Sequence, residues 1–82
     1  MDTIPFIVHS QLGKAEIRPC CRENNVVDYA VWLDNKLAFT VAKDLEQHER
    51  WVVALKNADD IIGDQLVQEI GNQIAAHYGQ NN

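Results

Sequence analysis

The stretch VDYAVWLDNKLAFTVAKD, residues 27–44, decides the fold because it contains two strand-like segments joined by a tight turn. β-Branched and aromatic residues fill 26–33 and 37–43, and Asp34 and Asn35 between them both tolerate positive φ. The pattern predicts an antiparallel hairpin. Further strands are expected over 4–9, 15–20 and 50–56, and Pro5 suits the first of them to the edge of a sheet.

The segment NADDIIGDQLVQEIGNQIAAHYGQNN, from residue 57, changes to the three- and four-residue spacing of an amphipathic helix. Asn57 or Asp59 is expected to cap this helix, and Gly79 to end it. The apolar arc consists of Ile62, Leu66, Val67, Ile70, Ile74 and Tyr78. Gly63 and Gly71 lie in or beside this arc, which predicts a close approach between helix and sheet.

These segments together predict an α+β protein. We expect a single antiparallel sheet of four or five strands, connected as a meander, followed by one C-terminal helix on one face, a ββββα-like order. The 82 residues predict a single domain, 1–82, with a short disordered tail from about 79 to 82.

Both faces of the predicted hairpin are apolar, and the length of its turn decides which residues share a face. A two-residue type I′ turn places Ala30, Trp32, Leu37, Phe39 and Val41 on one face and Tyr29, Val31, Leu33, Ala38, Thr40 and Ala42 on the other. A three-residue loop instead groups Tyr29, Val31, Leu33, Leu37, Phe39 and Val41 against Ala30, Trp32, Ala38, Thr40 and Ala42. In the last strand Trp51, Val53 and Leu55 alternate with Val52 and Ala54.

One helix cannot cover both sides of such a sheet, so one apolar face is left over. An apolar patch on a small protein usually marks a protein partner, a ligand or a second copy of the chain, and we expect a homodimer or a protein partner. Small residues and long Lys or Arg stems can also make such a face tolerable in water. Under the type I′ register the candidate interface is Tyr29, Val31, Leu33, Ala38 and Thr40, with the Trp32 set as the alternative.

The motif RPCCRENN, residues 18–25, places two cysteines side by side. Neighbouring side chains of a strand point to opposite faces, so Cys20 and Cys21 are poorly placed to hold one metal ion. We expect free cysteines that serve as small apolar fillers, with a reversible vicinal disulfide as the alternative.

No catalytic, metal-binding or cofactor-binding residue is predicted, and we do not expect an enzyme. His9, His48 and His77 have no ligand-spaced companions, and Asp59 with Asp60 is typical of a helix start. The chain contains no phosphate-binding or nucleophile motif.

Two alternative functions remain. The strand-rich part interleaves Lys36, Lys43 and Arg50 with Tyr29, Trp32 and Trp51. Its strands-then-helix order resembles, in topology alone, the ββββα units of Whirly and PUR-type binders of single-stranded nucleic acid, and this resemblance implies a curved sheet presenting such residues. The second alternative is a small apolar ligand in a groove between two copies.

The charge distribution argues against nucleic acid and against a membrane surface. The net charge is −5, and residues 57–82 contain four acids and no Lys or Arg. Phosphates and anionic lipids would repel this segment. The N-terminal apolar run is too short for a signal or a membrane span, so we expect a cytoplasmic, bacterial protein with reduced thiols.

Overall fold

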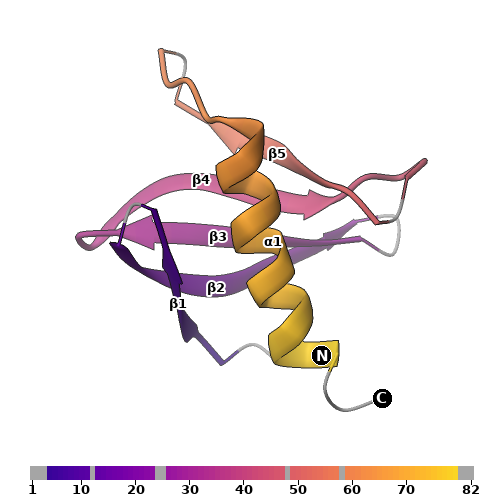
Figure 1. Ribbon diagram of the computed structural model, residues 1–82, viewed down its shortest axis with the longest axis horizontal. Helices are drawn as coiled ribbons and strands as arrows, with labels where there is room; N and C mark the ends of the chain where they lie inside the picture. Colours follow the sequence, from indigo (N-terminus) through magenta and orange to yellow (C-terminus); the bar gives the residue numbers. More distant parts are fainter. Residues whose placement is uncertain (1–3, 12, 24–25, 48, 58, 80–82) are drawn as a thin grey trace.

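The computed structural model describes residues 4–11, 13–23, 26–47, 49–57 and 59–79. Five strands are followed by one helix: β1 (Phe6–Ser10), β2 (Gly13–Glu23), β3 (Val26–Leu33), β4 (Lys36–Lys43), β5 (Trp51–Lys56) and α1 (Asp64–Gly79). The strands form one antiparallel sheet in the order β1-β2-β3-β4-β5, and α1 crosses one face of it (Figure 1). The predicted meander with a C-terminal helix is therefore confirmed. Of the expected tail, only Gly79 falls within the described residues.

The turn between β3 and β4 is the predicted two-residue type I′ turn. Leu33 pairs with Lys36, and the two residues between them have positive φ, 52° at Asp34 and 64° at Asn35. Turns of this type match the right-handed twist of the strands that they join. The short side chains of Asp and Asn tolerate this backbone conformation better than most residues do.

Bulges in the sheet change which residues share a face. Val31 pairs with Phe39 but Trp32 pairs with Leu37, so Ala38 is an extra residue in β4. Ala54 is likewise extra in β5, and Cys20 is extra in β2. Each bulge bends its strand and increases the local twist. The sheet therefore curves, and α1 contacts both of its outer strands, β1 and β5.

The core lies between the sheet and the apolar arc of α1. Val67, Ile70 and Ile74 pack against the inner sheet residues, and Ile70 has no exposed surface. The sheet contributes Val8, Ala15, Ile17, Val31, Phe39, Val41 and Trp51. At the C-terminal end of α1, the His77 ring stacks on Phe6 of β1 with 3.8 Å between ring centroids.

The helix begins later than the sequence predicts. The Asp60 amide donates to the Asn57 carbonyl, α1 begins only at Asp64, and neither Asn57 nor Asp59 caps it. The first helical bond joins the Val67 amide to the Gly63 carbonyl over 3.1 Å, which places Gly63 at the N-cap. The predicted close approach is correct for Gly71 and wrong for Gly63, since a Cβ at Gly71 would lie 2.1 Å from Trp51 Cγ whereas one at Gly63 would meet nothing within 4 Å.

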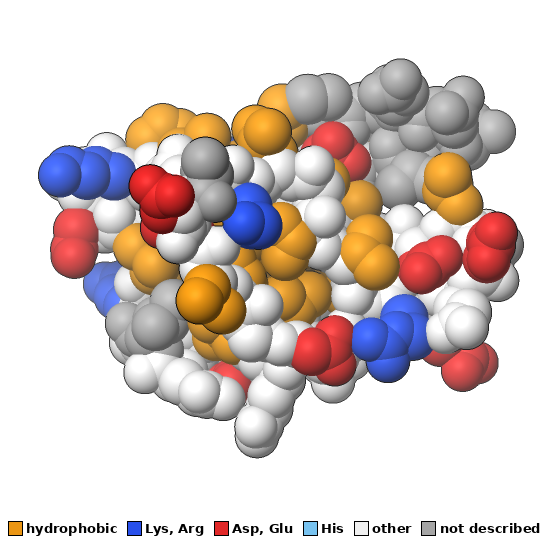
Figure 2. Space-filling model, turned by 90° about the horizontal axis from the view of Figure 1, so that it is seen from above, with side chains coloured by type: hydrophobic (Ala, Val, Ile, Leu, Met, Phe, Trp, Pro, Cys, Tyr) orange, Lys and Arg blue, Asp and Glu red, His pale blue; other side chains and the backbone are white. Residues whose placement is uncertain are grey.

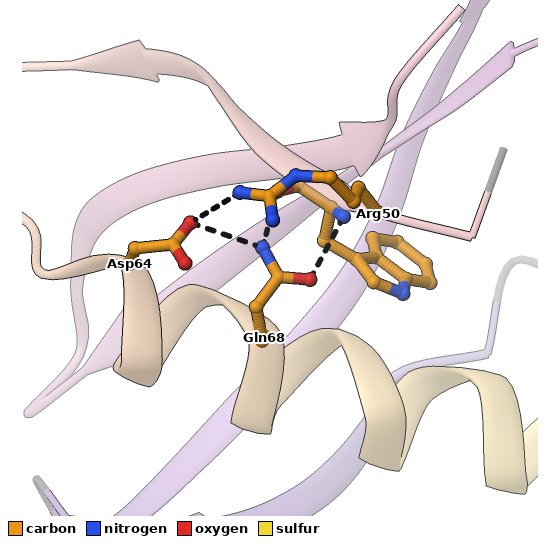
Figure 3. Close-up of polar contacts among 4 residues, drawn as sticks. Arg50, Asp64 and Gln68 are labelled. Atoms are coloured by element: carbon orange, nitrogen blue, oxygen red, sulfur yellow. Dashed lines mark hydrogen bonds and ion pairs between the residues drawn. The ribbon is translucent and has the colours of Figure 1, made fainter. Parts of the chain in front are cut away.

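Two glutamines of α1 bind the backbones of the two edge strands. Gln68 Oε1 accepts from the Trp51 amide at 3.1 Å, and Gln68 Nε2 donates to the Trp51 carbonyl at 2.7 Å (Figure 3). Gln73 makes the same pair of bonds with the amide and carbonyl of His9 in β1. Gln68 Nε2 also donates to Oδ1 of Asp64, one helical turn earlier in the chain, at 3.2 Å. The helix thereby occupies edge groups that would otherwise be open to another strand.

Candidate interaction surface

The sheet face opposite α1 can be followed along the strand pairs, because paired residues point to the same side. One row runs from Leu37 through Trp32 and Glu16 to Ile7, and a second runs from Leu55 through Thr40 and Ala30 to Arg18. A third pair joins Val52 with Ala42. The intervening rows, such as Phe39 with Val31 and Ile17, belong to the core under the helix. No described segment of the chain crosses the uncovered face.

The half of this face over β2 and β3 is screened by a charged side chain. The Arg18 guanidinium lies 4.0 Å from the centre of the Trp32 ring and donates to Glu16 over 2.6 Å. The guanidinium plane covers the ring while its charge is paired and in contact with water. Trp32 is therefore only partly exposed.

The other half, over β4 and β5, is aliphatic and has no such cover. We define the β4–β5 surface as Leu37, Thr40, Ala42, Val52 and Leu55. Leu55 is 61% exposed and Leu37 41%, while the short side chains of Thr40 and Ala42 lie low between their neighbours. Figure 2 looks onto the β5 edge of the molecule, where apolar side chains lie across the middle with charged ones around them. Contact with water at these aliphatic groups is unfavourable.

Two polar atoms on the uncovered face are buried. Among the described residues, neither the Thr40 hydroxyl nor the Trp32 indole N–H has a hydrogen-bond partner. Thr40 is 7% exposed. A buried polar group without a partner costs about 1–3 kcal/mol. These two unpaired groups therefore lower the stability that packing on this face contributes.

A small pocket opens where the β4–β5 surface meets the end of β5. It has a volume of about 130 Å³ and is lined by Leu37, Ala38, Phe39, Leu55, Lys56 and Asn57. Its lining thus combines apolar residues, among them the buried Phe39, with Lys56 and Asn57. Beside the rim, Lys56 Nζ donates to the Asp60 carbonyl at 2.8 Å. The next residue, Ile61, is 96% exposed.

The predicted interface residues do not share one face. Val31 is fully buried under α1, Tyr29 packs beside it, and Leu33 and Ala38 also contact the core. Only Thr40 belongs to the uncovered face. The predicted grouping is therefore wrong, and the cause is the bulge at Ala38, which exchanges the faces of β4 while leaving the type I′ turn intact. The alternative grouping of Ala30, Trp32, Ala38, Thr40 and Ala42 agrees with the uncovered face except at Ala38.

Sequence reasoning also missed exposed residues. Leu55 was expected to share a face with Trp51, but the extra Ala54 turns it to the opposite side. Ile61 does not belong to the apolar arc of the predicted helix. An apolar residue outside this arc was the signal in the sequence that its side chain is exposed. Leu37 was grouped with Phe39 in both registers, whereas the bulge separates them.

The expected free thiols are not found, because Cys20 is in a disulfide. It is the extra residue of the β2 bulge, and its side chain is exposed, so it is not an apolar filler. The side chain of Cys21, the other cysteine of the sequence, lies outside the described part. Within that part, no group of three or more His, Cys, Asp or Glu side chains is arranged to hold a metal ion.

No family model matches this chain, and neither a curated protein nor a solved structure matches it. Among the described residues, α1 is too short and too polar to cross a membrane.

Proposed function

We propose that this chain is a non-catalytic protein-interaction module that associates through the β4–β5 surface. The observation that carries the proposal is the contrast between the two halves of one sheet face. Arg18 covers Trp32 on one half, whereas Leu37, Val52 and Leu55 are left in water on the other. An aliphatic surface supports association, since acid-base and nucleophilic chemistry need convergent polar groups.

The nucleic-acid alternative has less support. Tyr29 and Trp51 pack in the core, 5.8 Å apart, and Trp32 is covered by Arg18. None of these rings offers an open face on which a base could stack. Of the basic residues, Arg50 is paired with Asp64 and Lys43 lies over Trp51.

The small-ligand alternative is limited by volume. Sites for small organic molecules usually measure about 300–1,000 Å³ and enclose most of the ligand. The apolar pocket beside β5, at about 130 Å³, admits one side chain or a similar group. It therefore fits as one part of a larger interface.

The test uses two leucines of nearly equal exposure, Leu55 at 61% and Leu45 at 62%. Leu45 lies in the segment between β4 and β5, outside the β4–β5 surface. Leu55→Lys should abolish self-association in a dilution series, or capture of a partner from cell extract, while Leu45→Lys should preserve it. Both variants should melt like the wild type as monomers. If both variants behave as the wild type in both assays, the proposal is wrong.

We keep the cytoplasm as the proposed location. The disulfide at Cys20 is an observation against it, because disulfides are typical of oxidising compartments. Cell fractionation, combined with thiol alkylation before and after reduction, tests the location and the redox state together. Recovery of the oxidised protein from a periplasmic or secreted fraction would contradict the proposed location.

A further inference from the structure

The pocket and Ile61 form a matched pair on one side of the molecule, and we infer that they bind each other between two copies of this chain. This inference rests on the proposed function and names the partner as a second copy. In it, Ile61 of each copy enters the pocket between Leu37 and Leu55 of the other. A two-fold axis makes both contacts at once, as in most homodimers.

The size of the pocket fits an aliphatic side chain. An engineered protein cavity of about 150 Å³ binds benzene, and the branched side chain of isoleucine is smaller than benzene. The pocket of about 130 Å³ is therefore large enough, and Leu37, Ala38 and Leu55 are among the residues that line it.

The exposure of Ile61 supplies the other half of the argument. At 96% it is the most exposed of the large apolar side chains described. It lies in the segment between β5 and α1, which projects beyond the edge of the sheet (Figure 1). Its neighbour Ile62 turns inward and packs against the core, so the chain places one isoleucine in the protein and presents the next to solvent.

The charges around the two features are complementary. Asp59 and Asp60 precede Ile61 and are exposed, whereas Lys56, whose Nζ donates to the Asp60 carbonyl of its own chain, is one of the residues that line the pocket. A second copy that inserts its Ile61 brings its own acids toward this lysine. Such rim charges contribute more to orientation and to the rate of encounter than to affinity.

The pocket contact alone is too small for a stable dimer. An interface of standard size buries about 800 Å² on each partner, which is roughly one seventh of the 5649 Å² surface of this chain. The β4–β5 surface is contiguous with the pocket through Leu37 and Leu55 and supplies further apolar area. We therefore place Ile61 at the centre of the contact and Val52 toward its margin.

Sedimentation equilibrium over a dilution series tests the inference, with Ile61→Asn as the variant and Leu45→Asn as its control. Asparagine is uncharged, so any loss reflects the missing aliphatic group. The wild type and Leu45→Asn should form dimers, and Ile61→Asn should raise the dissociation constant at least about tenfold. Because Ile61 is exposed, the melting temperature of the monomer should not change.

A cross-linking experiment locates the contact. p-Benzoylphenylalanine at position 61 is irradiated in an equal mixture of ¹⁴N and ¹⁵N protein. Peptides that join residue 61 of one isotope to residues 37–39 or 55–57 of the other support the inference. Cross-links confined to a single isotope overturn it.

The remaining outcomes separate this inference from the proposed function. A dimer that survives Ile61→Asn but is lost in Leu55→Lys overturns the role of Ile61 and leaves the β4–β5 surface as the interface. If the wild type is monomeric at every concentration, the inference that the partner is a second copy is wrong. The proposed function is still supported in that case if the wild type captures a different protein that Leu55→Lys does not capture. A dimer unaffected by either variant overturns both.

Discussion

The carboxamide of Gln68 hydrogen-bonds both the amide and the carbonyl of Trp51, so a helix side chain pairs with β5 much as a neighbouring strand would (Figure 3). The same amide group donates to Asp64, which in turn accepts from Arg50 at 2.9 Å. Both donors and the acceptor of Gln68 are therefore used. This arrangement fixes the position of α1 relative to β5.

Gln68→Ala should lower the free energy of unfolding by about 1–3 kcal/mol, because it leaves two partly buried backbone groups of Trp51 unpaired. Gln65→Ala is the matched control, since it makes the same change at an exposed position of the same helix. Urea denaturation measures both. Equal midpoints for the two variants would show that the bonds to Trp51 contribute nothing to stability.

Gly71→Ala should destabilise the protein by about 1–3 kcal/mol despite the higher helix propensity of alanine. The new Cβ would lie 2.1 Å from Trp51 Cγ, so the ring has to move. Gly63→Ser, where the added Cβ meets nothing within 4 Å, should change stability by less than about 0.5 kcal/mol. The cost of Gly71→Ala should shrink in a Trp51→Leu background, and an unchanged cost there would refute the clash.

Thr40→Val should stabilise the protein by about 1 kcal/mol, because it replaces a buried hydroxyl that has no described partner with a methyl group of similar size. For a domain of this size the expected rise in melting temperature is about 4–8 °C. Thr40→Ser, which keeps the hydroxyl, should not stabilise. Calorimetry at one fixed protein concentration distinguishes the variants, and a lower melting temperature for Thr40→Val would mean that the hydroxyl is hydrogen-bonded.

The stability of the protein should fall at alkaline pH through Tyr29. Burial raises the pKa of its phenol above the ordinary value of 10.0. Above that pH the unfolded chain loses a proton that the folded chain retains. The contribution of the Tyr29 phenol to the free energy of unfolding is therefore complete below about pH 10 and is lost as the pH rises through the folded pKa. The urea midpoint of the wild type should therefore decline more steeply above about pH 10 than that of Tyr29→Phe. Parallel declines would contradict this assignment.

The strand order, the type I′ turn and the helix could be predicted from the sequence because each has a local signal. Asp34-Asn35 between two β-rich segments and the periodicity after residue 63 are signals of this kind. The start of the helix was predicted too early, because the acids at 59 and 60 imitate a first turn. In the structure they belong to a turn stabilised by Asn57.

The composition of the uncovered face could not be predicted, although its existence could. Leu37, Ala38 and Phe39 follow the ordinary alternation of a strand, and nothing local marks Ala38 as an extra residue. The bulge helps to bend the sheet so that both edge strands reach α1, and this curvature is a property of the whole sheet. The β4 side chains beyond the bulge therefore change face relative to β3, so Tyr29, Val31 and Leu33 pack on the core side while Thr40 stays on the uncovered face.

The attachment of both edge strands to α1 has a consequence for synthesis. Chains leave the ribosome from the N-terminus, so the strands emerge before α1, which carries the Gln68 and Gln73 that bind the backbones of Trp51 and His9. During that interval both edges are open to strands of neighbouring nascent chains, and the apolar inner face has no cover. Emergence and docking of α1, rather than formation of the hairpin at Asp34-Asn35, is then the stage that ends this exposure to aggregation.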